Sequence, residues 1–191
     1  MKLDSFKSKL ITFMLMLGLC GCANIPSHII IAPDNIMTSA VSHNNKQTQL
    51  DVIDMRTANH IVQIMREGEA ATLVSAQERL EGTIKNNLIK HWKKQDLVIN
   101  TSGINTVNIS IEKAIISVAQ ETMKYEVQTE IVLKVTINNG SKKLTSMFSN
   151  RGNSDGPLQV DIAVLERNFN QRLAKLLQQI LADKKIRDFL K

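Results

Sequence analysis

The alternation of apolar and polar residues is clearest in the middle of the chain. Between Tyr125 and Ile137 every second residue is apolar or β-branched, and the residues between them are mainly polar or charged. This two-residue period predicts a long strand with one buried and one solvated face. Asn139-Gly140 is typical of a type I′ hairpin turn and predicts a return strand over about 143–150. The alternation of Val107, Ile109 and Ile111 predicts a further strand before it.

Four shorter apolar runs in the first half of the chain also predict strands, over residues 28–32, 50–55, 60–66 and 70–74. Pro33 ends the first run, because proline has no backbone N–H to continue a ladder. Residues 34–49 are mostly polar and are predicted to form a loop.

Two segments repeat their apolar residues every three or four positions, the period of an α-helix. The first opens on Ser75-Ala76-Gln77-Glu78, a capping box in which Ser75 and Glu78 satisfy free N–H groups, and runs to about Lys94. Gly82 inside it suggests that another segment packs closely there, since glycine costs up to about 1 kcal/mol relative to alanine. Residues 151–157 are predicted to form a loop. After it the second helix extends to about Asp183, and its apolar face contains Leu158, Ile162, Leu165, Phe169, Leu173, Leu176 and Ile180.

This order of strands, helix, three strands and helix predicts an α+β fold. Strands with one apolar face need a cover, and two amphipathic helices supply it. We therefore expect a two-layer sandwich, with a mainly antiparallel sheet and both helices on one face. The sequence has no internal repeat and no linker, so residues 28–191 are predicted to form a single domain.

The N-terminus has the pattern of a bacterial export signal. Three lysines among the first nine residues precede the uncharged run 10–19, which is too short to span a membrane as a helix. Leu19-Cys20-Gly21-Cys22 follows and resembles a lipobox, in which a small residue precedes the acylated cysteine. We predict a signal peptide over 1–21 and lipid attachment at Cys22, as N-palmitoyl and S-diacylglycerol groups. The alternatives are a buried helix with both cysteines in the core, or secretion without a lipid.

Acylation of Cys22 implies that residues 22–27 form a lipidated tether and that the acyl chains hold the domain to a membrane. Ala23 follows the cysteine where an aspartate would direct retention in the inner membrane of enterobacteria. The expected location of residues 28–191 is therefore the periplasmic face of the outer membrane.

Composition narrows the function classes. The chain has 191 residues, of which 43% are hydrophobic and 22% charged, as in ordinary globular proteins. The net charge of +6 would suit a nucleic-acid-binding protein, but an envelope location separates the chain from nucleic acid. The basic residues are also spread without long runs, so a solvated surface is the simpler interpretation.

No catalytic or metal-binding motif stands out. The four histidines, His28, His43, His60 and His91, have no zinc-ligand spacing, and we expect no metal or other cofactor. The glycine-rich segment 151–156 is a candidate anion loop at a helix start or a plain connector. Asp54 and Arg56 are the best candidates for a local ion pair that braces a turn, and a binding role is the weaker alternative for them.

Several features together resemble a known family. They are the lipobox followed by Ile29-Ile30-Ile31-Ala32-Pro33, the Asp54-Met55-Arg56-Thr57 turn, the capped helix, the Tyr125 strand and the ending Ile186-Arg187-Asp188-Phe189-Leu190. Their order is similar to that of the YajG family of outer-membrane lipoproteins in gamma-proteobacteria. The resemblance implies a location and a fold class, and it transfers no catalytic residue.

Three function classes are compatible with these observations. The first is a non-catalytic adaptor that binds an unidentified envelope protein, for example by strand addition along 143–150. The second is a carrier of a small lipid or glycan between sheet and helices. The third is an enzyme acting on wall or lipid, and we expect none because the sequence offers no reactive constellation.

Overall fold

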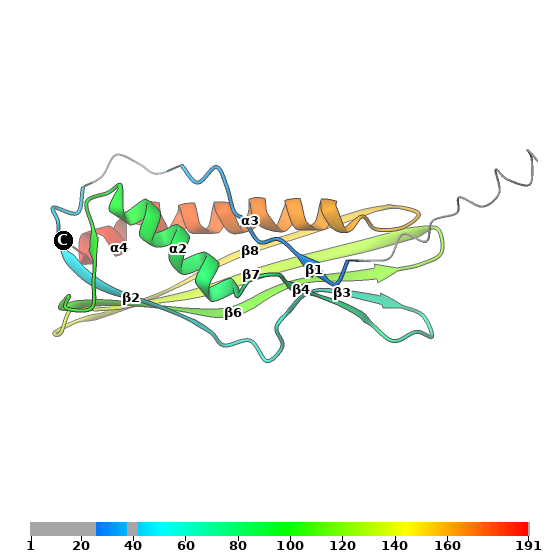
Figure 1. Ribbon diagram of the computed structural model, residues 1–191, viewed down its shortest axis with the longest axis horizontal. Helices are drawn as coiled ribbons and strands as arrows, with labels where there is room; N and C mark the ends of the chain where they lie inside the picture. The colour runs from blue at the N-terminus through cyan, green and yellow to red at the C-terminus, as the bar shows by residue number, and fades with distance from the viewer. Residues whose placement is uncertain (1–25, 38–41, 191) are drawn as a thin grey trace, which may run out of the picture.

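The computed structural model describes residues 26–37 and 42–190 as one sheet covered by helices (Figure 1). The predicted signal peptide and Cys22 lie outside the described residues. The elements are β1 (His28–Ile29), β2 (Gln47–Asp54), β3 (His60–Arg66), β4 (Thr72–Ala76), α2 (Leu80–Lys93), β5 (Val98–Ile99), β6 (Asn105–Gln120), β7 (Lys124–Asn138), β8 (Lys143–Pro157), α3 (Ile162–Ala182) and α4 (Lys184–Phe189).

The long strand β6 organises the sheet. On one side it pairs with β7 along its whole length, and β7 pairs in turn with β8. On the other side β2 and β3 lie end to end, with β2 beside residues 105–111 and β3 beside residues 116–120. Together β2 and β3 occupy one side of β6, with a break between them. The register of β6 against β7 is irregular between Ile111 and Lys113.

The prediction of a mainly antiparallel two-layer sandwich is not confirmed, because the sheet is mixed and curled. Four of its pairings are parallel, those of β1 with β4 and of β2 with β5, together with those of β2 and β3 with β6. The reason is the path of the chain. After β3, the chain turns back through β4 and α2, so β6 starts from the same end of the sheet as β2 and β3 and runs parallel to them.

Helices α2 and α3 contact each other and the sheet, and the core lies between them and the strands (Figure 1). Fully buried side chains come from the helices and from the sheet, including Trp92 of α2, Phe169 of α3 and Ile131 of β7. The residues after α3 form the separate helix α4, which buries Ile186. Among the described residues, no helix has the length and apolar character needed to cross a membrane.

Several predicted boundaries are wrong. Ser75 does not cap α2, because its backbone belongs to β4 and pairs with both β1 and β3. The helix begins later, at Leu80, without a capping side chain. Residues 151–157 are not a loop but the second half of β8, paired with β7 throughout. The space beside Gly82 is open, so the predicted close packing there is also wrong.

Most of the predicted first strand, residues 28–32, contacts α3 and does not pair with a strand. Only His28 and Ile29 pair as β1, and the chain then follows the helix. Glu166 accepts a hydrogen bond from the Ile30 N–H at 2.7 Å, and the side-chain amide of Asn170 bonds to Ala32 N and Ile30 O, both at 2.9 Å. Side chains of α3 thus take the place of a neighbouring strand.

Candidate functional site

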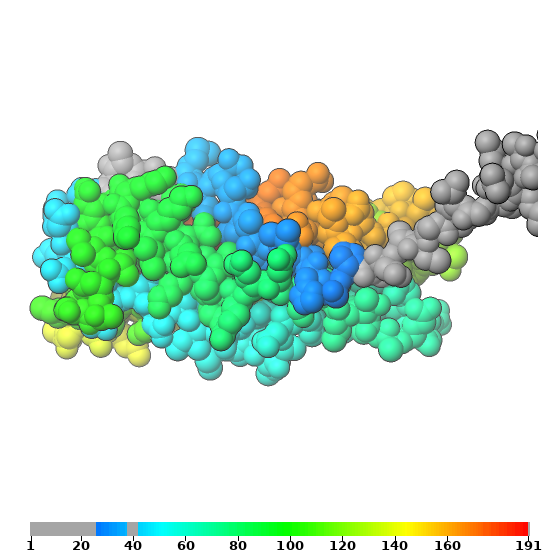
Figure 2. Space-filling view, in the orientation of Figure 1, coloured from blue at the N-terminus to red at the C-terminus, as the bar shows by residue number. Residues whose placement is uncertain are grey.

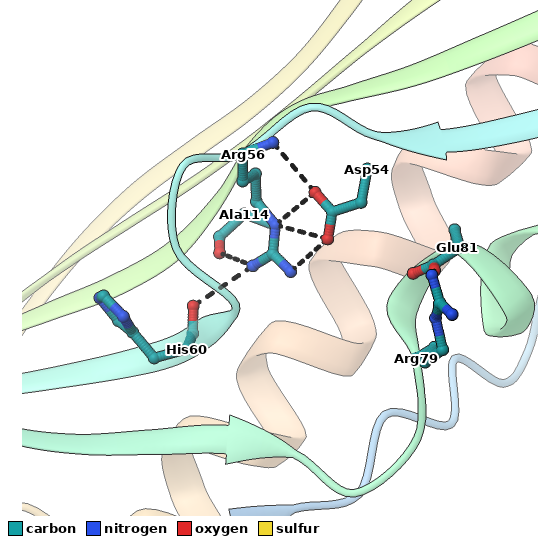
Figure 3. Close-up of polar contacts among 6 residues, drawn as sticks. All are labelled: Asp54, Arg56, His60, Arg79, Glu81 and Ala114. Atoms are coloured by element: carbon teal, nitrogen blue, oxygen red, sulfur yellow. Dashed lines mark hydrogen bonds and ion pairs between the residues drawn. The ribbon is translucent and has the colours of Figure 1, made fainter.

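The two candidate residues, Asp54 and Arg56, lie where β2 ends and β3 has not yet begun (Figure 3). In this gap no strand of the described residues lies beside the edge of β6. Met55 N still bonds to Ile111 O at 3.1 Å, and the chain then bends away until His60. The site therefore arises from a break in strand pairing.

The guanidinium of Arg56 fills this gap. It donates from Nη1 to Ala114 O at 3.0 Å and to His60 O at 3.2 Å. It also forms a forked pair with the Asp54 carboxylate, at 2.9 Å from Nε to Oδ1 and 2.7 Å from Nη2 to Oδ2. One side chain thus joins three backbone segments, namely the end of β2, the start of β3 and the exposed edge of β6.

Burial and charge make the pair strong. The side chains of Arg56 and Asp54 are 8% and 15% exposed. Burial alone would raise the pKa of Asp54, but hydrogen bonds from the Arg56 side chain and backbone, with its positive charge, hold that pKa below its usual value. The carboxylate therefore stabilises the fold above the usual pKa of an aspartate, and this contribution is lost as the pH falls through the lower folded-state pKa.

This arrangement favours the structural interpretation of Asp54 and Arg56. Every nitrogen of the guanidinium already donates to a protein oxygen, so little capacity is left for a ligand. Beside the pair is a hollow of about 410 Å³, whose lining includes Asn59, Gln77 and the exposed Arg79. Arg79 pairs with Glu81, which also lines this hollow, and the two lie apart from the Arg56 fork (Figure 3).

The four histidines belong to different segments of the fold. His28 is exposed at the start of β1, whereas His43 and His91 are buried in a loop and in α2. His60 reaches the candidate site only through its backbone carbonyl. Among residues 26–37 and 42–190 no group of three or more histidine, cysteine or acidic side chains has a metal-binding arrangement.

A second candidate site, which the sequence patterns did not indicate, lies where α3 packs on β8. Arg172 donates to Asn150 Oδ1 at 3.1 Å and to the backbone carbonyl of Arg151 at 3.2 Å. Its guanidinium lies directly over Gly152, where a Cβ atom would be 2.0 Å from Nη2. A glycine in the middle of a strand was the available signal, because it often marks a close approach.

Around Arg172 is a polar hollow of about 520 Å³ between the strand and the helix. Three of its lining residues are basic and none is acidic; they are Ser149, Asn150, Arg151, Asn168, Gln171, Arg172, Lys175 and Gln179. Arg151 is partly neutralised, because it contacts Glu130 at 2.7 Å. This composition suits a polar or anionic group.

The predicted anion loop at residues 151–156 is corrected by the same geometry. These residues are paired in β8, so their backbone N–H groups do not surround a helix start. The loop before α3 is shorter, and the N-terminus of α3 is capped by Asp161, whose carboxylate accepts from Ala163 N at 2.8 Å.

Comparison with solved structures places the fold among known ones. A Xanthomonas campestris protein of the DUF330 family is similar with a TM-score of 0.53 and 10% identity, covering 82% of this chain and 93% of that one. A neuraminyllactose-binding hemagglutinin homologue from Helicobacter pylori is similar with a TM-score of 0.51 and 8% identity, covering 85% and 96%. At these identities the similarity concerns the fold alone.

Comparison at the level of sequence is more specific. No curated protein sequence matches significantly. A family model described as an uncharacterized lipoprotein, however, matches residues 33–191 and confirms the resemblance drawn from the sequence. The chain therefore belongs to this family of lipoproteins, the YajG family.

Proposed function

We propose that the protein is a non-catalytic adaptor, held by acyl chains on Cys22 at the periplasmic face of the outer membrane, which binds an envelope protein along the edge of β8. The observation that carries the proposal is this edge. Among the described residues β8 pairs with β7 alone, over a strand of 15 residues. Long unpaired edges are templates for another strand, and proteins normally shorten or protect them.

Only part of β8 is protected. Arg172 caps the carbonyl of Arg151, which closes the second half of the edge to an incoming strand. The first half, residues 143–150, has no such cap among the described residues and contains a single charged residue, Lys143. We call residues 143–150 the open edge. Leu144 and Phe148 on it are only partly buried against the core, so an added strand would cover them.

The position of the open edge suits a partner in the periplasm. Lys143 pairs with Asn138, at the end of the sheet opposite to the turn that joins β6 and β7. Strand β1 runs parallel to β4, so the lipidated tether enters from the side of that turn. The open edge therefore begins at the end that lies farther from the anchor.

Photo-cross-linking in cells tests the adaptor proposal. A photoreactive residue is placed at Met147, which is 60% exposed, in the full chain with its signal peptide. Proline is then introduced at Thr145 or Ser146. Successive N–H groups of a strand point to opposite sides, so one of these variants removes an outward N–H and keeps the β7 ladder.

The expected result is a defined adduct that is lost in the proline variant that still folds. Thr145→Ala and Ser146→Ala are the matched controls, because they keep the N–H and should keep the adduct. An adduct that survives in the folded proline variant contradicts binding along the open edge. A complete absence of adducts from position 147 in the wild-type background contradicts binding along the open edge.

Attachment through Cys22 has a separate test. Cys22→Ser should release the chain from the outer-membrane fraction, and mass spectrometry of the wild-type N-terminal peptide should show the acyl groups. Acylated protein found in the inner-membrane fraction would contradict the location that Ala23 suggests.

The basic hollow around Arg172 favours carriage of a glycan or lipid headgroup as a second candidate function. The Helicobacter protein is named for binding neuraminyllactose, an acidic sugar, and neuraminyllactose is therefore a suitable first probe. Calorimetric titration should show binding that Lys175→Gln weakens and Lys185→Gln leaves unchanged. Equal binding by both variants, or none by the wild type, contradicts this candidate.

A further inference from the structure

Three chain reversals meet at one end of the sheet. Arg66 of β3 pairs with Gln120 of β6, Gln120 pairs with Tyr125 of β7, and Lys124 pairs with Pro157 of β8. The turns after β3 and β6 and the loop after β8 therefore lie side by side, over residues 67–71, 121–123 and 158–161. Figure 2 shows them in teal, yellow-green and gold at the right-hand end. We call this end the tip.

The tip exposes large apolar side chains. Met123 is 68% exposed, Leu158 58% and Met65 44%. Met65 and Met123 both line a hollow of about 1060 Å³, together with polar residues such as Gln120 and Gln159. Single exposed apolar residues are ordinary, but a group from three separate segments at one end marks a contact surface.

Hydrogen bonds inside the tip join the segments that carry Met123 and Leu158. The buried side-chain amide of Gln120 donates to Glu121 O and to Leu158 O, both at 2.7 Å, and accepts from Val160 N at 3.0 Å. Leu158 N in turn bonds to Met123 O at 2.9 Å. One residue of β6 thus ties the turn after β6 to the loop after β8.

Leu158 also has a strained backbone. Its φ is +62°, in the left-handed region that a branched apolar residue rarely adopts. Such strain persists only where the surroundings enforce it, and it is concentrated at functional positions. Here it holds an apolar side chain in solvent, which is unfavourable unless something covers that side chain.

The short tether would keep the tip close to the membrane that holds the acyl chains. Strand β1 is parallel to β4, which begins just after the turn 67–71, so the chain enters β1 from the tip. Cys22 precedes His28 by six residues, which reach at most about 20 Å. His28 pairs with Ser75, and the three residues back to Thr72 already extend about 10 Å toward the tip.

We propose that the tip rests on the membrane that holds the lipid anchor, with Met65, Met123 and Leu158 entering its interfacial region. This rests on the proposed acylation of Cys22. The charged groups around them are Arg66, Glu67, Glu69, Glu121, Lys124 and Glu126, with Arg66 and Lys124 paired to glutamates. The surplus of acidic groups means that apolar contact, and not attraction to anionic lipid, holds the tip.

Labels at defined positions of the acylated full-length protein test the proposal. When Cys22 carries its acyl groups and Cys20 has left with the signal peptide, an introduced cysteine is the single free thiol. Met123→Cys carries an environment-sensitive fluorophore at the tip. Met147→Cys on β8 and Ile104→Cys, 82% exposed before β6, are the matched controls. The protein is reconstituted in vesicles of phosphatidylethanolamine and phosphatidylglycerol at 3:1 that contain a lipid-borne quencher.

The expected result is strong quenching at position 123, at least about fivefold greater than at positions 104 and 147, as burial in the interfacial region requires. Little quenching at position 123 in acylated protein overturns the proposal, and so does equal quenching at all three positions. The N-terminal peptide is analysed by mass in the same sample. If acyl groups are absent, the proposed acylation of Cys22 is overturned, and so is the proposal that the tip rests on the membrane.

Discussion

At the residue scale, Arg56 shows how one side chain can replace strand pairing. Where β2 and β3 separate, the β6 carbonyl of Ala114 would be left without a partner, and Arg56 supplies the donor. Asp54 orients the guanidinium and balances its charge within a buried setting. The pair that the sequence predicts as a turn brace therefore also completes the sheet.

Arg56→Met should lower the free energy of unfolding by about 3 kcal/mol, because it leaves two backbone carbonyls without this donor and the buried Asp54 carboxylate with only the backbone N–H of residue 56. Urea unfolding followed by circular dichroism measures this. Arg79→Ala is the control, since Arg79 is largely exposed and its ion pair contributes under about 1 kcal/mol. Equal effects of the two substitutions would contradict the brace.

His91 predicts a dependence of stability on pH. Its buried position, with the charges of Lys94 and Lys90 nearby, lowers its pKa below the usual 6.5. Below about pH 6.5 the His91 side chain is protonated in the unfolded chain but remains neutral in the folded protein. The free energy of unfolding therefore falls with pH until the folded-state pKa of His91 is passed. His91→Gln should flatten this slope between about pH 6.5 and 5. Urea unfolding curves across that pH range measure the slope, and His28→Gln, at an exposed histidine, is the control. An unchanged slope in His91→Gln would contradict the role assigned to His91.

At the scale of elements, identical residue types have opposite roles. Apart from the nearby backbone of α2 itself, a Cβ atom at Gly82 would have no described atom within 4 Å, whereas a Cβ at Gly103 would lie 2.7 Å from the backbone of Thr48 in β2. The first glycine only weakens its helix. The second allows the turn before β6 to pack directly on β2.

Gly82→Ala should therefore raise the free energy of unfolding by about 0.5–1 kcal/mol, since alanine restricts the unfolded chain and favours the helix. Gly103→Ala should lower it by about 1–3 kcal/mol, because a backbone neighbour cannot move aside like a flexible side chain. Thermal and urea unfolding of the two variants form one experiment. A stabilising Gly103→Ala would show that the close approach is not required.

At the scale of the whole molecule, the two proposed surfaces lie apart. The tip is formed where β6 turns into β7, and the open edge begins at the opposite end of β7, near Asn138 (Figure 1). A short tether would keep the tip on the membrane and direct the open edge into the periplasm. Anchoring and partner binding can then occur together without competing for one surface.

Lengthening the tether should separate these two properties. Roughly twenty Gly/Ser residues inserted after Ala23 add a flexible coil of about 25 Å and lower the effective concentration of the tip at the membrane. Quenching at a label on position 123 should decrease, whereas cross-linking from position 147 should persist if the partner is freely reachable. Undiminished quenching would mean that apolar contact alone holds the tip.

The local pattern of the sequence determined much of the secondary structure. The alternation in 125–137 and the hairpin at Asn139 are confirmed as β7 and its turn into β8, although the loop between the paired Asn138 and Lys143 is four residues long and not two. The apolar faces of α2 and α3 are confirmed as buried, but Leu158, predicted on the second face, lies before α3 and is exposed. The family resemblance is confirmed as well. These features are readable because period and order along the chain are local properties.

Only the tertiary structure determined which strands lie side by side and in which direction they run. A two-residue period shows which face of a strand is buried, but not which strand lies beside it or in which direction that strand runs. The parallel pairing of β2 and β3 with β6 depends on the return path through β4 and α2. The same holds for Ser75, whose backbone pairs with two strands and so cannot cap a helix, and for Arg56, whose partner Ala114 is 58 residues away.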